Sequence, residues 1–487
     1  MSDVIIHKKN EVYIKLECEP HILYDLQQYF TFEVPGAKFM PQMRNRHWDG
    51  LIRLLSVHTG EIYAGLLDKV IDKLKLHNYT YEFRENKFYG LPFEVNEEIS
   101  KEGVKDYMSA ICKHSPRHYQ IDGVYDCLRY NRRLLISPTA SGKSLMIYAL
   151  VRYYVDKGQK ILLVVPTTSL VEQMVGDFRD YGWDADSYCH KIYSGREKTN
   201  EHPVTVTTWQ SIYKLERRFF EDYDVVIGDE AHLFKSKSLI TIMSHLHHAK
   251  YRFGFTGTLD GTQTHKWVLE GLFGPSYKVT RTSELMEQGH VSKLDIKCLV
   301  LKHPPQKFNV FEEEIQFIVQ HEKRNKFIKN LVLDLKGNTL VLFSRIEAHG
   351  EPLFNLINTN KDNERKVFFV HGGVDTEERE RVREITEREN NAIIVASYGV
   401  FSTGINIKNL HNVVFASPSK SRIRNLQSIG RVLRKANNKT KAVLYDIADD
   451  CTHNSRKNYT LNHFIERIKI YNEEQFNYEI ITINLKP

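Results

Sequence analysis

A loop of small residues followed by Lys143 and Ser144 offers the clearest chemistry in this chain. The apolar run 134–136 precedes the loop, and an apolar helical pattern begins directly after Ser144. Backbone N–H groups of such a loop and of the helix N-terminus can point at the phosphates of a nucleotide. Lys143 would reach the outer phosphates and the Ser144 hydroxyl would hold Mg²⁺. The residues expected to line the phosphates are Thr139, Ala140, Ser141, Gly142, Lys143 and Ser144. An ordinary polar turn is the alternative, because Ser137 stands where a first glycine is usual.

Two adjacent carboxylates, Asp229 and Glu230, follow the apolar run 225–227. A carboxylate at a strand end beside the phosphate loop can hold Mg²⁺ through water, and its neighbour can orient or deprotonate the attacking water. We assign Asp229 to the metal and Glu230 to the water. A solvated strand end is the alternative, since acidic residues often terminate strands.

Two arginines, Arg431 and Arg434, lie one helical turn apart and share a helix face. Such a pair can clamp a γ-phosphate, and an inserted arginine accelerates phosphoryl transfer by about 10³–10⁵-fold. The sequence does not rank the two. A basic helix face in water is the alternative reading of the same pair.

Strands and helices must position these side chains, and the sequence pattern indicates where they lie. Apolar runs at 134–136, 161–165, 204–207, 225–227 and 251–255 alternate with helical patterns, and the rhythm restarts with runs at 340–343, 367–370, 393–396, 413–415 and 442–445. Continuous apolar runs indicate strands covered on both faces, and the alternation is typical of a doubly wound parallel sheet. An alternating strand pattern at 11–17, an Asp49-Gly50 turn and a helical pattern at 66–76 predict a small α+β module ahead of them.

The expected domains are therefore a small α+β substrate-contacting domain (1–80), a connector (81–115), an ATP-binding lobe (116–280), a second lobe (281–450) and a C-terminal helical and strand extension (451–487). A chain of 487 residues is long enough for two to four domains.

Composition narrows the class of protein further. A net charge of +7 is only a weak indication of a polyanionic partner. Six cysteines without a C-x-x-C pair frame neither disulfides nor a recognisable zinc site, which fits a reducing cytosol. No stretch approaches the roughly 20 apolar residues of a membrane span, and no basic and apolar signal peptide opens the chain.

Taken in order, these motifs resemble those of the superfamily-two helicases. Residues 137–144, 229–232 and 256–258 are similar to motifs I, II and III, and 402–406 and 427–434 to motifs V and VI. The resemblance covers roughly 116–450 and implies two tandem RecA-like lobes that use ATP and Mg²⁺. Ser428 stands where many relatives have arginine, so one contact of motif VI is in doubt.

The resemblance also implies roles for single residues. Nucleotide contacts are expected from Arg117, Gln120, His232, Gly404 and Gln427, with His232 bridging the motifs of the two lobes. Coupling of nucleotide state to lobe closure is expected from Thr256 and Thr258, and nucleic-acid contacts from Ser169, Thr208, Gln210 and Thr403.

The N-terminal module adds Arg44, Arg46 and Trp48, two guanidiniums beside an indole that could grip phosphate and base. The alternative is that Trp48 belongs to a core and that the arginines are solvated.

The motifs themselves support a nucleic-acid-dependent ATPase. The resemblance extends to phage-encoded DNA helicases, and it implies an ATP-driven motor that acts on branched DNA in recombination, repair and replication. Fork regression, junction branch migration and R-loop unwinding are the expected reactions, in the cytoplasm of a bacterial host if the chain is phage-encoded. The resemblance is also consistent with RNA–DNA hybrids as substrates. It is consistent with a monomeric protein. An RNA helicase and an ATP-gated clamp without translocation are the alternatives.

Overall fold

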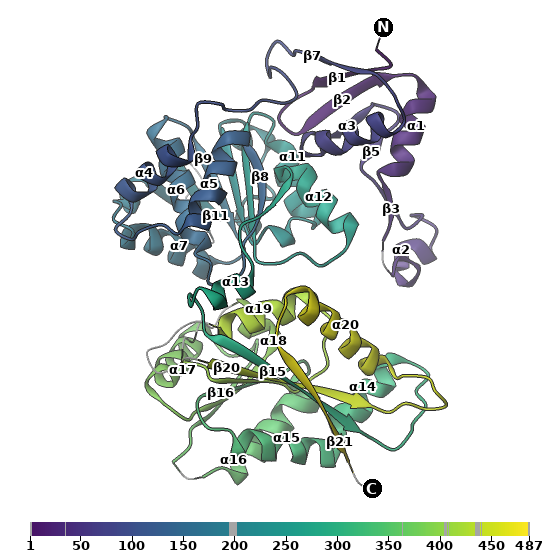
Figure 1. Ribbon diagram of the computed structural model, residues 1–487, viewed down its shortest axis with the longest axis vertical. Helices are drawn as coiled ribbons and strands as arrows, with labels where there is room; N and C mark the ends of the chain where they lie inside the picture. The colour runs from purple at the N-terminus through teal and green to yellow at the C-terminus, as the bar shows by residue number, and fades with distance from the viewer. Residues whose placement is uncertain are drawn as a thin grey trace. The chain divides into compact units, whose positions relative to one another are not determined.

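The computed structural model describes residues 2–34, 36–193, 202–362, 364–403, 407, 409–433, 439 and 441–485. The chain forms two compact units, one made of Met1–Ser137 and Gly142–Val279 and the other of Pro138–Ser141 and Thr280–Pro487. Figure 1 labels their helices and strands. Every helix among the described residues falls short of the length and apolar character that a membrane span requires.

The first unit opens with a small mixed sheet in the strand order β5-β6-β2-β1-β7. The strands are β1 (Val4–Lys8), β2 (Tyr13–Cys18), β5 (Leu55–Ser56), β6 (Glu61–Tyr63) and β7 (Tyr81–Arg84), with helices α1 (Pro20–Tyr29) and α3 (Leu67–Leu76). Buried and half-buried residues alternate along β1, as they do in a strand with one face on a core. These elements confirm the predicted small α+β module, here called the N-terminal module. Strand β7 lies in the segment that the sequence predicted to be a connector.

A tongue, residues 31–53, extends from this module (Figure 1). Strand β3 (Thr31–Glu33) pairs antiparallel with β4 (Leu51–Arg53), and the short helices η1 (Ala37–Phe39) and α2 (Pro41–Arg44) lie between them. Gly50 has φ of 80°, a left-handed conformation that favours glycine, at the turn that the sequence predicted.

The rest of the first unit is lobe 1, a seven-stranded sheet in the order β10-β11-β9-β12-β13-β8-β14. Its strands are parallel, and they are β8 (Arg132–Ile136), β9 (Ile161–Val165), β10 (Cys189–Ile192), β11 (Val204–Thr208), β12 (Val225–Asp229), β13 (Tyr251–Thr256) and β14 (Ser276–Lys278). All residues of β9, β11 and β12 are buried, because helices cover both faces of the sheet.

The helices of lobe 1 are α4 (Lys101–Ile111), α5 (His118–Tyr130), α6 (Lys143–Asp156), α7 (Thr168–Asp180), α8 (Ala185–Tyr188), α9 (Trp209–Ile212), α10 (Arg217–Glu221), η3 (Ala231–Leu233), α11 (Lys237–His245) and α12 (Gln263–Phe273). In Figure 1, α6 and α7 lie on one side of the strands and α11 and α12 on the other.

The second unit holds lobe 2, another seven-stranded parallel sheet, in the order β17-β18-β16-β19-β20-β15-β21. Its strands are β15 (Lys293–Lys302), β16 (Thr339–Phe343), β17 (Val367–Val370), β18 (Ile393–Ser397), β19 (Asn412–Phe415), β20 (Lys441–Asp450) and β21 (Tyr478–Asn484). Its helices are α13 (Thr282–Glu287), α14 (Phe311–Gln320), α15 (Glu322–Asp334), α16 (Glu351–Asn360), α17 (Thr376–Arg388), α18 (Tyr398–Thr403), α19 (Arg422–Val432) and α20 (Tyr459–Glu473). The two sheets confirm the predicted tandem parallel α/β lobes.

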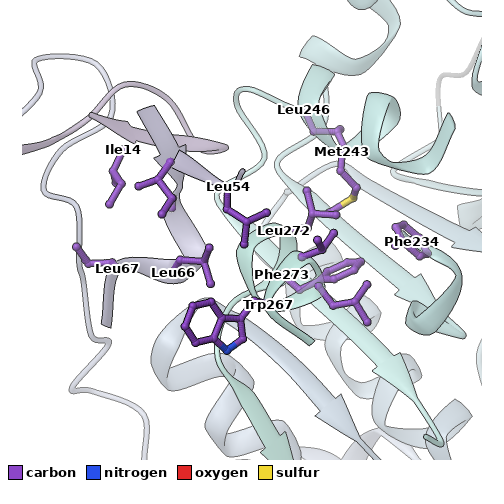
Figure 2. Close-up of a cluster of buried hydrophobic side chains, with 14 of the residues drawn as sticks. Ile14, Leu54, Leu66, Leu67, Phe234, Met243, Leu246, Trp267, Leu272 and Phe273 are labelled. Atoms are coloured by element: carbon purple, nitrogen blue, oxygen red, sulfur yellow. The ribbon is translucent and has the colours of Figure 1, made fainter. Parts of the chain in front are cut away.

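The N-terminal module and lobe 1 share one hydrophobic core (Figure 2). Trp267 on α12 packs against Phe30 and Phe32 of the module, with ring centroids 5.5 and 5.0 Å apart. Gly65 lies so close to α12 that a Cβ atom there would be 2.0 Å from the carbonyl oxygen of Glu270. This shared packing fixes the module to α12.

Candidate functional site

Three adjacent strands deliver the predicted catalytic segments to one edge of the lobe 1 sheet. In the parallel register, Ile136 at the end of β8 lies beside Thr256 of β13, and Phe255 lies beside Asp229 at the end of β12. The loops that follow parallel strands leave from the same edge, and this edge is where α/β sheets bind ligands. The phosphate loop, the carboxylate pair and the Thr256 turn therefore lie together.

The phosphate loop is closely fitted to its surroundings. Gly142 has φ of 82°, and a Cβ atom there would lie 2.2 Å from Nε2 of Gln120. Only glycine meets both conditions without strain. The Ser141 hydroxyl donates to the carbonyl oxygen of Pro138 at 2.6 Å, which closes the preceding turn. Lys143 and Ser144 then form the first turn of α6, and a helix N-terminus favours an anion.

Lys143 and Glu230 are brought together, with Nζ 3.2 Å from Oε1. The backbone of Glu230 is held at φ of 48°, which is unusual for a residue other than glycine and costs on the order of 1–3 kcal/mol. Such strain persists only where the surrounding structure enforces it, and it is concentrated at functional sites. Here it directs the Glu230 side chain towards Lys143.

The two neighbouring carboxylates have opposite electrostatic environments. Burial raises the pKa of Asp229 to about 6, although the positive charge of Lys143 acts in the other direction. Burial would also raise the pKa of Glu230, but Lys143 and His232 outweigh it and hold this pKa well below its usual range. Glu230 is therefore an ionised carboxylate at neutral pH, and Asp229 is a buried one that a cation would stabilise.

The donor set fits a magnesium ion held mainly through a nucleotide. Ser144 supplies a hydroxyl and Asp229 a carboxylate, both hard oxygen donors of the kind that Mg²⁺ prefers. Within the described part of the chain, no group of three or more His, Cys, Asp or Glu side chains could hold a metal ion alone. Magnesium commonly uses one or two protein oxygens and completes its shell with phosphates and water.

His232 and the two threonines form a connected group. His232 Nδ1 lies 3.1 Å from the Thr256 hydroxyl, and that hydroxyl donates to the carbonyl oxygen of Thr258 at 2.9 Å. The turn that carries Asp229, Glu230 and His232 (residues 229–232, here called the carboxylate turn) is thus linked to the Thr256–Thr258 turn within lobe 1. The bridging of the two lobes by His232 stays a prediction.

Gln120 and Arg117 lie at the N-terminus of α5. The Gln120 side chain is buried and accepts from the Arg117 backbone N–H at 2.8 Å, while Arg117 donates to the Tyr119 hydroxyl at 2.7 Å. Gln120 borders the phosphate loop, because its Nε2 occupies the space that a Cβ atom of residue 142 would need. This is a suitable place for a residue that reads the base of a nucleotide.

The predicted residues of lobe 2 are described only in part. Gln427 and Arg431 lie on α19, both half-buried, and Thr403 is the last residue of α18. Gly404 and Arg434 lie outside the described residues.

The predicted nucleic-acid contacts of lobe 1 differ in their exposure. Ser169 and Gln210 are exposed and follow β9 and β11, whose ends are neighbours in the sheet. Thr208 is buried, and its hydroxyl lies 2.9 Å from that of Ser211. A contact through the Thr208 hydroxyl would therefore require a change of conformation.

In the tongue, Arg46 is exposed and Trp48 is half-buried. The Trp48 indole donates to the carbonyl oxygen of Leu51 at 2.8 Å, which anchors one edge of the ring. Trp48 also lines a pocket of about 730 Å³ with His47, Met40 and Ile52. Arg44 ends α2.

Sequence reasoning missed two neighbours of the site. The Tyr181 hydroxyl lies 2.7 Å from the Ser144 hydroxyl, and burial raises the pKa of Tyr181 to about 12, so it stays a neutral phenol. His265 Nε2 lies 2.9 Å from the carbonyl oxygen of His232. Both belong to loops or helices outside the motifs, and no local pattern marks them.

Three families of sequences match this chain. Residues 3–84 match the family described as DNA helicase UvsW, N-terminal, residues 113–261 match the Type III restriction enzyme, res subunit, and residues 322–436 match the Helicase conserved C-terminal domain.

Among individual proteins, the ATP-dependent DNA helicase uvsW of Enterobacteria phage T4 is 37% identical, over 99% of this chain and 100% of its own. The DNA 3'-5' translocase XPB2 of Sulfurisphaera tokodaii is 22% identical, over 80% of this chain and 93% of its own.

Solved structures are similar as well. The crystal structure of T4 UvsW matches with a TM-score of 0.52 and 34% identity, covering 99% of this chain and 100% of that one. The structure of Dbp5 of S. cerevisiae bound to RNA and ADP BeF3 matches with a TM-score of 0.54, over 79% of this chain and 96% of that one. Its identity of 15% makes it a likeness of fold alone.

Proposed function

This chain belongs to the UvsW family of ATP-dependent DNA helicases, and from that premise we propose that it hydrolyses ATP at the Lys143–Glu230 site to remodel branched DNA. The observation that carries the proposal is the meeting of Lys143 and Glu230 at 3.2 Å, on the sheet edge where the phosphate loop begins α6.

Different residues of the site bind the phosphates, hold the metal ion and orient the attacking water. The loop N–H groups and Lys143 bind and neutralise the phosphates, and Ser144 and Asp229 would hold Mg²⁺, which supplies further neutralisation of phosphate charge. Glu230 orients the attacking water. A carboxylate whose pKa is held well below its usual range accepts protons poorly, so hydrogen bonding to the water is the role that its charge supports.

Nucleotide binding would also change Glu230. Lys143 is paired with Glu230, and the phosphates of ATP would compete for the same ammonium group. When Lys143 turns to the phosphates, Glu230 loses its strongest cationic partner and becomes a better hydrogen-bond acceptor for water. Arg431 and Arg434 are proposed to stabilise the γ-phosphate from lobe 2, in line with motif VI.

We propose branched DNA as the substrate, with fork regression, junction migration and R-loop unwinding as the reactions. The T4 relative is named a DNA helicase, and the N-terminal module, which matches its family over 3–84, carries the exposed Arg46 and the anchored Trp48. We further propose that the protein acts as a monomer in the cytoplasm of a bacterial host, on DNA and on RNA–DNA hybrids. Ser169 and Gln210 are proposed to contact the DNA backbone from lobe 1.

Steady-state ATP hydrolysis tests the site. Lys143→Ala and Glu230→Gln should abolish turnover, with ATP binding retained in Glu230→Gln. Lys157→Ala, an exposed lysine directly after the other end of α6, is the matched control and should hydrolyse ATP normally. Undiminished hydrolysis in either site variant would refute the assignment.

The same assay tests the substrate when it is run with single-stranded DNA, duplex DNA, a four-way DNA junction and structured RNA at one salt concentration. Stronger stimulation by the junction than by linear DNA or RNA is expected. Arg46→Ala with Trp48→Ala should reduce that preference without reducing basal hydrolysis. Equal stimulation by RNA would favour an RNA helicase, and hydrolysis without strand displacement would favour a clamp.

A further inference from the structure

His265 lies beneath the carboxylate turn and contacts two oxygen atoms. Its Nε2 is 2.9 Å from the carbonyl oxygen of His232, and its Nδ1 is 2.9 Å from Oδ1 of Asp260. Because a carbonyl oxygen can only accept a hydrogen bond, Nε2 carries a proton and donates to His232, while the Asp260 backbone N–H lies 3.3 Å from Nδ1. With only 2% of the side chain exposed, the ring has little competition from water.

Asp260 is a suitable partner for that ring. Burial by itself would raise the pKa of Asp260, but hydrogen bonds from His265 and Thr262 outweigh burial and hold it well below its usual range. Lys235 reaches the same carboxylate at 3.0 Å. The acceptor is therefore ionised at neutral pH, and the His265 ring is held between a fixed carboxylate and a backbone carbonyl.

His265 is also in the first turn of α12, the helix that anchors the N-terminal module. The Thr262 hydroxyl caps this helix by accepting from the His265 N–H at 3.3 Å. Two residues further, Trp267 packs against the aromatic rings of the module. Glu270, near the end of the helix, meets Lys69 of the module at 3.0 Å. The same short helix thus contacts the carboxylate turn and the module.

We propose that His265 is a positioning residue for ATP hydrolysis and that α12 links the carboxylate turn to the N-terminal module. His265 holds the backbone of His232, and this fixes the direction of the His232 ring toward Glu230 and Thr256. A movement of this turn is carried by the rigid helix to Trp267, because packed side chains and regular elements transmit displacement. The inference rests on the proposed ATP site.

A purely structural role for His265, as a helix-end residue in a packed interior, is the competing explanation. The two explanations differ in which ring nitrogen matters. A glutamine places its amide nitrogen close to the position of Nε2 and can still donate to the His232 carbonyl. An asparagine places its amide nitrogen close to Nδ1 and keeps only the Asp260 contact.

The test compares His265→Asn with His265→Gln in ATP hydrolysis stimulated by DNA. His265→Asn should lower kcat by about 10- to 100-fold, taking as a guide the loss found when a residue that orients a metal ligand is removed, with little change in the KM for ATP. His265→Gln should stay close to the wild type. His21→Asn, at an exposed histidine of α1, is the control substitution.

Equal kinetics of the two His265 variants would overturn the positioning role. If His265→Asn does not fold, Asp260→Asn replaces it, and wild-type kinetics in that variant would overturn the role as well. Lys143→Ala and Glu230→Gln separate this inference from the proposed function. Hydrolysis that survives in those variants refutes the ATP site, whereas its loss there, together with indifference to the His265 substitutions, refutes only the inference.

The link to the module is tested by Trp267→Leu, measured as base pairs opened per ATP hydrolysed. This variant should keep DNA-stimulated hydrolysis and lose at least about half of the opened base pairs per ATP. Lys69→Met, which removes the Glu270 ion pair and an ammonium group 5.3 Å from the centre of the Trp267 ring, should cause a smaller loss in the same direction. An unchanged ratio in folded Trp267→Leu would refute the link.

Discussion

Replacing Arg467 with methionine should lower the free energy of unfolding of lobe 2, because it breaks a buried ion pair with Asp446. Arg467 on α20 and Asp446 on β20 are almost completely buried, with side-chain exposures of 1% and 0%. Arg467 Nε donates to Oδ2 at 2.8 Å and Nη2 donates to Oδ1 at 2.8 Å, so the pair is bidentate. The Tyr471 hydroxyl also donates to Asp446, at 2.8 Å.

The magnitude follows from the charge that the substitution leaves behind. Removing one partner of a buried ion pair costs about 3–5 kcal/mol, because the remaining charge has lost its compensation. With a urea m-value of about 2–3 kcal/mol/M, the midpoint of unfolding should fall by about 1–2.5 M. Adding Asp446→Asn removes that charge, and the double variant should regain most of the loss.

The chain provides an internal control for this measurement. Its four tryptophans, Trp48, Trp183, Trp209 and Trp267, all belong to the first unit. Tryptophan fluorescence therefore reports the first unit, while far-UV circular dichroism reports both. Arg467→Met should shift the transition seen by circular dichroism and leave that seen by fluorescence in place.

The reasoning fails if the circular dichroism midpoint of Arg467→Met equals that of the wild type, or if Asp446→Asn restores nothing. A functional consequence is also expected. Arg467 Nη1 donates to the carbonyl oxygen of Ser419 at 2.9 Å, just before α19, which carries Gln427 and Arg431. Stimulated ATP hydrolysis should therefore fall in Arg467→Met even under conditions in which the variant is folded.

Three further outcomes are expected. Burial lowers the pKa of His349 from its ordinary value of 6.5 to about 3. Between these two values the unfolded chain binds a proton that the folded chain does not, so the free energy of unfolding should fall by about 1.4 kcal/mol for each unit by which the pH decreases. His349→Gln should reduce that slope in urea titrations. Gly142→Ala should weaken ATP binding in a nucleotide titration because its Cβ would meet Gln120, whereas Gly158→Ala, with φ of 71° and nothing within 4 Å, carries only the backbone strain. Gly65→Ala should lower the Tm seen by fluorescence, because its Cβ would lie 2.0 Å from a backbone oxygen of α12.

The strands that the sequence predicts best are those buried on both faces. The apolar run 161–165 coincides with β9, because a strand covered by helices on both sides needs apolar residues throughout. Strands with an exposed face were harder to predict. Strand β7 has exposed residues at three of its four positions, so its sequence resembles that of a connector. Its place is set by pairing with β1, a contact between distant parts of the chain.

In the candidate site, too, some contacts could be predicted from the sequence and others could not. The meeting of Lys143 and Glu230 could be predicted, because parallel strands deliver their following loops to one edge. The contact between Ser144 and Tyr181 could not, since it depends on the path of the chain after α7. The burial of Thr208 was equally invisible, because a threonine at a strand end has the same sequence signature whether its hydroxyl is exposed or covered.

The N-terminal module and lobe 1 bury surface against each other, and the sequence pattern does not reveal this. A boundary near residue 80 separates two kinds of sequence pattern, but the free energy of folding depends on which surfaces are buried together. Trp267 belongs to lobe 1 by sequence and to the aromatic packing of the module by contact. Because α12 contacts both, the module and the carboxylate turn belong to the same compact unit of the chain. The proposed link between a DNA-contacting module and the hydrolysis site requires such an element, and in this chain α12 provides it, with Trp267 packed against the module and His265 bonded to the carboxylate turn.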